Sequence, residues 1–158
     1  MSDNREYNTA KVIVFKLLDK EYTIPVTQVR GIEKIHHITR VPNTAPYVKG
    51  VINLRGGVTP IIELRTRFGV EEGKDEDGTR VMIVSGGGSD AGLIVDTAND
   101  VLDMEENQIE PKPAVAGTVE NSFIKGVAKL ENRLLNIVDL ERILGIDKKL
   151  DQDGEEIS

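Results

Sequence analysis

Apolar residues come in short, β-branched runs separated by polar or glycine-rich breaks. Residues 12–18 (VIVFKLL) form such a run, Asp19 and Lys20 interrupt it, and residues 21–26 form a second run that ends at a proline. Two runs of this length around a polar pair predict a β-hairpin. The same alternation continues to residue 144 and predicts a chain built mainly from short strands.

A short helix is predicted after this hairpin. Thr27 is a residue type that caps helix N-termini, and Val29 and Ile32 would share one helical face. Gly31 disfavours the helix because glycine has a low helix propensity. Residues 38–41 read as a brief extended stretch that Pro42 ends, and residues 43–46 as a loop.

A second hairpin is predicted at residues 48–54 and 58–64, joined by the turn Arg55-Gly56-Gly57. Glycine supplies the positive φ that tight turns require. Pro60 lacks an N–H group, so its strand is expected at a sheet edge or a bulge. A short helix should then end at Gly69.

The second half of the chain repeats this order. Residues 47–70 (YVKGVINLRGGVTPIIELRTRFGV) align without a gap with residues 123–146 (FIKGVAKLENRLLNIVDLERILGI), and residues 11–26 align more weakly with residues 80–95. Identical pairs are Lys49/Lys125, Gly50/Gly126, Val51/Val127, Leu54/Leu130, Ile61/Ile137, Leu64/Leu140 and Gly69/Gly145. One unit has therefore been used twice.

Five or so short strands in each unit are too few for an open sheet, and closure into a small barrel removes free edges. The charged segment 71–79 is the best boundary between the units. We therefore predict a single mostly β domain of two pseudo-symmetric barrels with short helices. Residues 11–70, with return strands from the second half, would form the first barrel and residues 80–146 the second. Residues 1–8 and 147–158 are expected to be flexible tails.

Composition is that of a globular protein: 158 residues, 39% hydrophobic and 30% charged. Cysteine is absent, which excludes disulfides and thiolate chemistry. No apolar run approaches the roughly 20 residues of a membrane-spanning helix. The polar N-terminus shows no signal peptide, so a cytoplasmic protein without direct membrane insertion is expected.

Charge is uneven along the chain. Residues 1–69 carry 11 Lys/Arg and 6 Asp/Glu, whereas residues 70–158 carry 9 and 21, within a net charge of −7. Arg30, Lys34, Arg40, Lys49 and Arg55 could give the first unit a basic face for an acidic partner, although an acidic linker and tail also explain the imbalance. Aromatic content is only 4%, which disfavours nucleic acid.

Motifs for catalysis or metal binding fail when tested against their requirements. The glycine-rich stretch 86–92 precedes a strand rather than the helix that a phosphate loop needs. His36 and His37 are adjacent, so on an extended segment they point in opposite directions. The carboxylates of residues 96–106 lack the EF-hand order, and no serine lies in G-x-S-x-G. No catalytic residue, metal site or cofactor is predicted.

One stretch carries a family resemblance. The core KGV-x-NLRG at residues 49–56, followed by VTPIIEL at residues 58–64, resembles the CheW family of bacterial chemotaxis coupling proteins. The resemblance extends from about residue 11 to residue 146. It implies two SH3-like β-barrel subdomains, in agreement with the repeat. It also implies a non-catalytic adaptor that joins the cytoplasmic tip of chemoreceptors to the histidine kinase CheA in receptor arrays at the inner face of the membrane.

The resemblance also implies binding residues. Arg55 matches the arginine of NLRG, and the implied receptor groove between the subdomains would be lined by Val29, Gly50, Arg55, Val81, Ala91 and Gly92. The implied kinase surface is apolar, with Ile35, Ile38 and Val48 as candidates. Related sequences often have glutamate where this chain has Gly31, which leaves the orientation of Arg55 open. Related proteins that carry extra kinase or receiver domains fit less well than a stand-alone coupling protein.

Two other classes of function stay open from the residues. A nucleic-acid-binding β-barrel would share the fold, although charge and aromatic content disfavour it. A small metal- or phosphate-dependent enzyme would need a site that the residues do not display.

Overall fold

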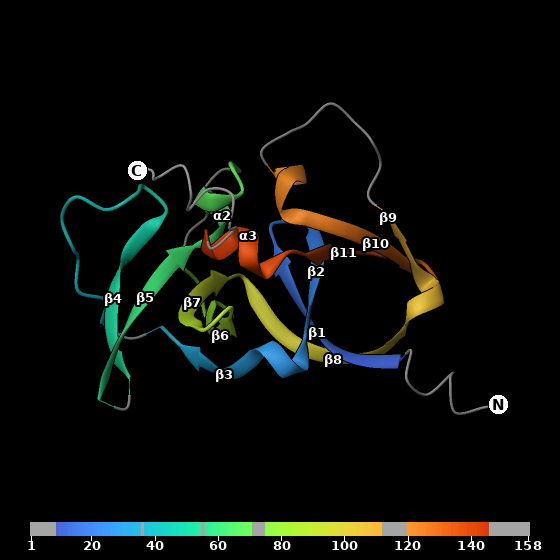
Figure 1. Ribbon diagram of the computed structural model, residues 1–158, viewed down its shortest axis with the longest axis horizontal. Helices are drawn as coiled ribbons and strands as arrows, with labels where there is room; N and C mark the ends of the chain where they lie inside the picture. Colours follow the sequence, from blue (N-terminus) through green and yellow to red (C-terminus); the bar gives the residue numbers. More distant parts are fainter. Residues whose placement is uncertain (1–8, 36, 55, 71–74, 112–119, 146–158) are drawn as a thin grey trace.

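The computed structural model describes residues 9–35, 37–54, 56–70, 75–111 and 120–145. Two curved sheets make up most of this part of the chain, and they lie side by side in Figure 1. The predicted mostly β class is confirmed. The expected tails, residues 1–8 and 147–158, lie outside the described residues.

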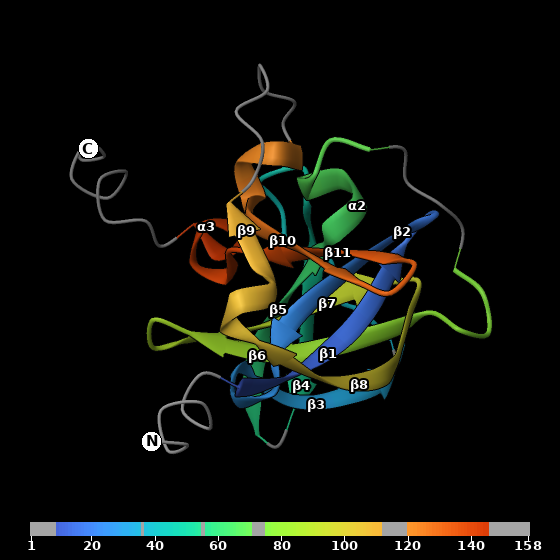
Figure 2. The ribbon, with the colours of Figure 1, turned by 90° about the vertical axis from the view of Figure 1, so that its right-hand side faces the viewer.

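The first sheet forms a five-stranded barrel and the second a six-stranded barrel, which faces the viewer in Figure 2. In spatial order the five-stranded barrel contains β3 (Val29–Lys34), β6 (Arg80–Gly86), β7 (Ser89–Val95), β5 (Gly57–Glu63) and β4 (Val48–Leu54). The six-stranded barrel contains β8 (Thr97–Glu105), β1 (Thr9–Leu17), β2 (Lys20–Pro25), β11 (Arg133–Val138), β10 (Ile124–Leu130) and β9 (Ile109–Pro111).

Each barrel draws strands from both repeats. β1 and β2 from the first half join the six-stranded barrel, whereas β6 and β7 from the second half join the five-stranded barrel. Neither barrel is therefore a contiguous stretch of the chain. The physical reason is that a strand pattern marks an edge but does not select its partner. Here the parallel pairs β2–β11 and β5–β7 place each repeat's first hairpin against the other repeat's second hairpin.

The two repeats pair in the same register. Thr23 lies opposite Ile137 in the parallel pair β2–β11, and Gly92 lies opposite Ile61 in the parallel pair β7–β5. Ile61 and Ile137 are also aligned in the sequence repeat. A bulge interrupts β4 before Gly50 and β10 before Gly126, again at matching positions. The predicted pseudo-symmetry is confirmed for the two hairpins of each repeat, whereas β9 has no counterpart strand in the described part of the five-stranded barrel.

The first hairpin of each repeat is buried on both faces. In β6, Met82 and Val84 point into a central cluster between the barrels, whereas Val81 and Ile83 point into the core of the five-stranded barrel. β1 behaves in the same way, with Phe15 in the central cluster. Burial of both faces explains why these strands read as continuous apolar runs rather than as alternating ones.

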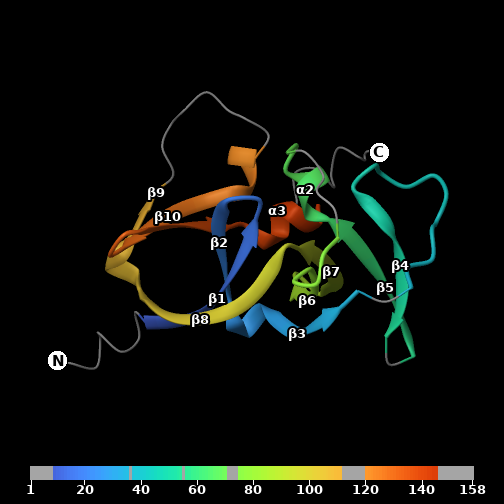
Figure 3. The ribbon, with the colours of Figure 1, turned by 180° about the vertical axis from the view of Figure 1, so that it is seen from behind.

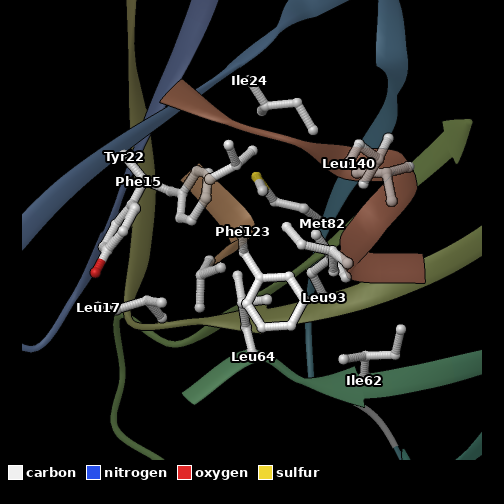
Figure 4. Packing of buried hydrophobic residues seen from close by; sticks show 14 of the residues in the cluster. Phe15, Leu17, Tyr22, Ile24, Ile62, Leu64, Met82, Leu93, Phe123 and Leu140 are labelled. Carbon is white, nitrogen blue, oxygen red and sulfur yellow. The ribbon is translucent and has the colours of Figure 1, made fainter. Parts of the chain in front are cut away.

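The central cluster joins the two barrels into one body. Figure 4 shows Phe15 and Tyr22 beside Met82 and Leu93, so strands of both barrels supply it. Its aromatic rings pack in sequence, with Phe15–Tyr22, Tyr22–Phe68 and Phe68–Phe123 centroids 5.5, 5.4 and 5.4 Å apart. Burial of this apolar area is the main force that holds the barrels together.

Helices are short and sit beside the central cluster. α2 (Leu64–Arg67) and α3 (Leu140–Leu144) are repeat counterparts, and both lie near the contact between the barrels in Figure 3. The short turns are η1 (Val26–Gln28), η2 (Glu106–Gln108) and η3 (Glu120–Phe123).

The predicted helix carrying Val29 and Ile32 is wrong. Only η1 forms there, and Val29 begins strand β3, which pairs with β6. Pairing with a ready strand edge overrides the local signal from Thr27, because tertiary context outweighs a weak propensity.

Candidate protein-binding surfaces

Four of the six predicted receptor-contact residues come together on neighbouring strands. Val29 lies on β3, Val81 on β6, and Ala91 and Gly92 on β7, and these strands are adjacent in the five-stranded barrel. Gly50 lies on β4 at the far edge of the same sheet. Arg55 lies outside the described residues.

These residues are mostly buried. Val81 and Ala91 are each 3% exposed, and they point to opposite faces of the sheet, into the barrel core and the central cluster respectively. Val29 is half-buried against the central cluster. Because this cluster fills the space between the barrels, the described side chains among the six lie mainly in the interior, beneath the proposed binding surface. Direct receptor contact by them stays a prediction.

Gly50 is required by the approach of the backbone of residue 39. Its φ of +151° is unfavourable for other residues, and a Cβ atom there would lie 2.2 Å from the Thr39 carbonyl oxygen. Thr39 and Val51 form a β-bridge whose N–H···O distances are 2.9 and 2.8 Å. Gly50 therefore lets the segment before β4 close the edge of the five-stranded barrel.

The three predicted kinase-contact residues lie near this edge. Ile35 and Ile38 are partly buried and pack against the core of the five-stranded barrel. Val48 begins β4 and is also partly buried, opposite Ile62 on β5. All three are accessible in part, so they combine a structural role with an apolar outer surface.

A hollow opens beside the β4–β5 turn, with a volume of about 280 Å³. We call it the β4–β5 hollow. Its lining includes Arg30, Glu33, Leu54, Gly57, Val58 and Asp90. Val58 is 69% exposed, and the Arg30 side chain lies 3.8 Å from the Asp90 carboxylate. The hollow thus combines apolar and charged groups beside the connection from β4 to β5, where Arg55 stands in the sequence.

The matching place in the six-stranded barrel is occupied by an ion-pair cluster. Arg133 corresponds to Gly57 in the repeat, and its guanidinium contacts Glu21 at 3.0 Å and Asp100 at 3.1 Å. The hydrogen bond to Glu21 is the main cause of a raised Arg133 pKa. Asp100 corresponds to Gly31 in the weaker repeat. The five-stranded barrel therefore has glycine in place of both the arginine and this carboxylate.

Sequence reasoning missed the hollow as a site, although the signal was present. The gap-free repeat aligns Gly57 with Arg133, and continuing the weaker repeat aligns Gly31 with Asp100. Two glycines in one copy are aligned with two charged residues in the other, which indicates that this place differs between the two barrels. Gly31 and Gly57 lie on strands that are not neighbours in the sheet, and only the tertiary structure brings both to the lining of the hollow.

A buried arginine network stabilises the chain after β5. Arg65 is 1% exposed, and its guanidinium contacts Glu63 at 2.6 Å, Asp96 at 3.2 Å and Asp75 at 3.4 Å. The hydrogen bonds to Glu63 raise the pKa of Arg65, while burial opposes that shift. Because its partners lie on β5, after β7 and in the 75–79 segment, Arg65 ties these parts together.

Among the described residues, no group of three His, Cys, Asp or Glu side chains could hold a metal ion. His36 lies outside them. No described helix has the length and apolar composition needed to cross a membrane.

Comparison with known proteins agrees with this architecture. The model of the CheW-like domain matches residues 11–148. The chain belongs to the CheW family. The chemotaxis protein CheW of Bacillus subtilis is 46% identical over 142 residues, which cover 90% of this chain and 90% of that protein. CheW of Klebsiella aerogenes is 35% identical over 136 residues, covering 86% and 82%.

A solved structure of the family shows the same fold. The scaffolding protein TtCheW from Thermoanaerobacter tengcongensis has a TM-score of 0.81 and 35% identity, with coverage of 87% of this chain and 94% of that one. The expected two-barrel CheW fold is confirmed. Membership of the CheW family makes the chain a chemotaxis adaptor and scaffold protein.

Proposed function

We propose that this scaffold joins the cytoplasmic tip of chemoreceptors to the histidine kinase CheA. The observation that carries the proposal is that this member of the CheW family has the β4–β5 hollow beside its segment KGV-x-NLRG. The chain would act in the cytoplasm and be recruited to receptor arrays at the inner face of the membrane.

The receptor would bind at the β4–β5 hollow and the adjoining turn. Receptor tips are helical hairpins, and a helix docks by placing an apolar face in a groove with polar groups at the rim. Val58 and Leu54 supply apolar contact, while Arg30 and Asp90 supply charged groups at the rim. Val29, Val81, Ala91 and Gly92 would hold β3, β6 and β7 beneath this surface, with Gly50 closing the barrel edge and Arg55 in the turn.

The kinase would bind at Ile35, Ile38 and Val48, on the edge of the same barrel. Their side chains pack inward on the barrel core yet stay partly exposed, so they offer a rigid apolar surface. Protein interfaces are organised around such apolar centres. Binding at two faces of one rigid barrel lets a receptor shift reach the kinase without catalysis by the scaffold.

Coupling of this kind requires a difference in free energy between states. Receptor binding alters kinase activity only if the bound scaffold contacts the active and inactive kinase states unequally. The buried central cluster and the Arg65 network keep the scaffold rigid, so that movement at one face is transmitted rather than absorbed.

Reconstitution tests the proposed function. Kinase autophosphorylation is measured with receptor-containing membranes, with and without this chain. We expect receptor control of the kinase only when the chain is present. Receptor control that is equal without the chain would refute the proposal.

Charge reversal then tests the receptor face. Arg55→Glu is expected to weaken receptor pull-down at least about tenfold, because arginines are common interface hot spots. Lys129→Glu is the matched control, since Lys129 is exposed on β10 of the other barrel. Both variants should keep the thermal unfolding of the parent. A folded Arg55→Glu variant with normal receptor binding would remove Arg55 from the site.

Loss of apolar surface tests the kinase face. Ile38→Ser is expected to lower affinity for the CheA regulatory domain while receptor binding stays unchanged. Ile109→Ser is the control, because Ile109 contacts Gly126 in the other barrel as Ile38 contacts Gly50. Equal losses for both variants would argue against a kinase surface at Ile38.

A further inference from the structure

The six-stranded barrel contains an apolar pocket of about 280 Å³. Its floor is formed by Val12, Thr23, Met104 and Ile137, each less than a tenth exposed. Ile109 and Lys125 stand at its rim and are exposed. The pocket lies in the opposite barrel from the β4–β5 hollow, so it is independent of the proposed receptor and kinase faces.

A buried hydroxyl group without a partner lies on this floor. Thr23 is 1% exposed, and its Oγ1 atom has no hydrogen-bond partner among the described residues. A buried hydroxyl without a partner costs about 1–3 kcal/mol of stability. Valine has nearly the same shape and would avoid this cost. Thr23 therefore destabilises the unliganded fold unless another molecule supplies the missing hydrogen bond.

The other barrel has a different arrangement at the same position. Gly92 is the counterpart of Thr23, and the side chains of Ile61 and Val81 lie across it. Each places a methyl carbon 2.7 Å from where a Cβ atom of residue 92 would be. The counterparts of these two residues are Ile137 and Val12, which line the pocket together with Thr23. The position that holds glycine in one barrel therefore holds threonine in the other, and the threonine places a polar atom on the pocket floor.

We propose that this pocket binds a small, neutral, apolar molecule that carries one hydrogen-bonding group, which pairs with Thr23 Oγ1. The volume is about twice the roughly 150 Å³ of an apolar cavity that admits benzene, so a molecule with two fused rings fits. Apolar walls supply affinity, and the single hydroxyl selects ligands with a matching polar atom. Lys125 and Glu106 both stand at the rim, which leaves no net charge there to select an ion.

Indole is the probe for this test, because it is a fused-ring molecule with one N–H donor. Indene has the same shape without the donor and is the matched control. Amide chemical shifts of the full-length chain are followed by NMR as each probe is added. We expect saturable shifts at Thr23, Met104 and Ile109, with indole bound about fivefold more tightly than indene, as one neutral hydrogen bond allows.

Two variants test the role of the hydroxyl. Thr23→Val should remove the preference for indole over indene and raise the melting temperature of the unliganded chain. Thr23→Ser, which keeps the hydroxyl, should retain the preference. A Thr23→Val variant that still prefers indole would overturn the proposal, as would equal binding of both probes to the parent chain or shifts absent from the pocket.

Other occupants give distinct results. Shifts of the same amides that grow with protein concentration alone would assign the pocket to a second copy of the chain. Shifts caused by the CheA regulatory domain, with none caused by indole, would assign it to a protein side chain. Either result would overturn the small-molecule proposal and leave the receptor and kinase faces untouched.

Discussion

Arg67 of the first repeat stacks on Phe123 of the second, with the guanidinium carbon 4.8 Å from the ring centroid. The same guanidinium lies 4.0 Å from the ring of Tyr47, which is the repeat counterpart of Phe123. It also donates hydrogen bonds to the carbonyl oxygens of Ile143 and Arg142, at 3.0 and 2.9 Å. Arg67 therefore fastens α2 to the C-terminal end of α3 across the pseudo-symmetry axis.

Replacing Arg67 should loosen this contact between the repeats. We expect Arg67→Met to lower the free energy of unfolding by about 2–3 kcal/mol, because hydrogen bonds from a charged donor and ring contacts are lost. Burial is the main cause of a lowered Arg67 pKa, so the uncharged replacement recovers some desolvation cost. Urea unfolding measures the change, with the exposed Arg40→Met as control. A loss below about 0.5 kcal/mol, as is usual for a substitution of an exposed residue, would show that these contacts of Arg67 do not stabilise the fold.

Arg65 should be more critical than Arg67, because it neutralises a buried carboxylate. Glu63 is 2% exposed, so Arg65→Met leaves it without its main cation, at a cost of about 3–5 kcal/mol. The double variant Arg65→Met with Glu63→Leu should recover most of this loss. Urea unfolding of both variants provides the check. A double variant no more stable than the single one would contradict the account.

The Arg65 pKa shift also predicts the pH dependence of this contribution. Its folded pKa is raised above the ordinary arginine value, so the stabilisation is fully present below the unfolded pKa and is lost only as pH rises through the folded pKa. Arg65 therefore stays protonated across the neutral pH range. The parent and the double variant both lack an unpaired buried charge, so deprotonation of Arg65 should not alter the difference in their stability in that range. Unfolding curves at several neutral pH values measure this, and a steady loss with rising pH would be evidence against it.

The two bulge glycines should differ in their tolerance of a side chain. Gly50→Ala places a Cβ atom 2.2 Å from the Thr39 carbonyl oxygen at a φ of +151°, whereas Gly126→Ala leaves 3.0 Å to the Glu110 carbonyl oxygen. We expect a loss of about 3 kcal/mol or more for Gly50→Ala and a clearly smaller loss for Gly126→Ala. Thermal unfolding distinguishes them, and equal losses would mean that Thr39 moves aside freely.

Filling the β4–β5 hollow should block the receptor without unfolding the chain. A Cβ atom on Gly57 would have its nearest contact at 3.6 Å, so Gly57→Arg can be accommodated. The new guanidinium would lie near Asp90, as Arg133 lies near Glu21 in the other barrel. We expect receptor pull-down to fall at least about tenfold with kinase binding retained.

The reciprocal variant Arg133→Gly is the control for this experiment. It removes a partly exposed ion pair and should cost about 1 kcal/mol of stability without affecting receptor binding. Unchanged receptor binding by a folded Gly57→Arg variant would place the receptor elsewhere.

The local pattern of apolar and polar residues predicted most strands. It failed where pairing with a distant strand outweighs the local secondary-structure propensity. The runs that became β1, β2, β6 and β7 were recognisable because both faces are buried, which demands continuous apolar sequence. β3 was mistaken for a helix because its alternation is weak and its stability comes from β6. β9, three residues long, forms only because β10 offers it an edge.

The candidate site followed the same division. Family resemblance named Arg55 and the residues around it, but burial of Val81 and Ala91 was not readable, since a barrel interior and a groove require similar apolar side chains. The β4–β5 hollow and the Thr23 pocket arise from differences between aligned positions. Their significance becomes clear only by comparison with the other barrel, where side chains occupy the equivalent space.

The amino-acid sequence by itself determined that one strand-rich unit occurs twice, that the protein belongs with the CheW coupling proteins, and that no catalytic motif is displayed. The tertiary structure alone decided which hairpin closes which barrel. Strand identity is a local property of side-chain period and turn residues, whereas strand partnership depends on which edges meet in space. Because each repeat gives its first hairpin to the other repeat's barrel, the β4–β5 hollow and the pocket at Thr23 each combine residues that lie far apart in the chain.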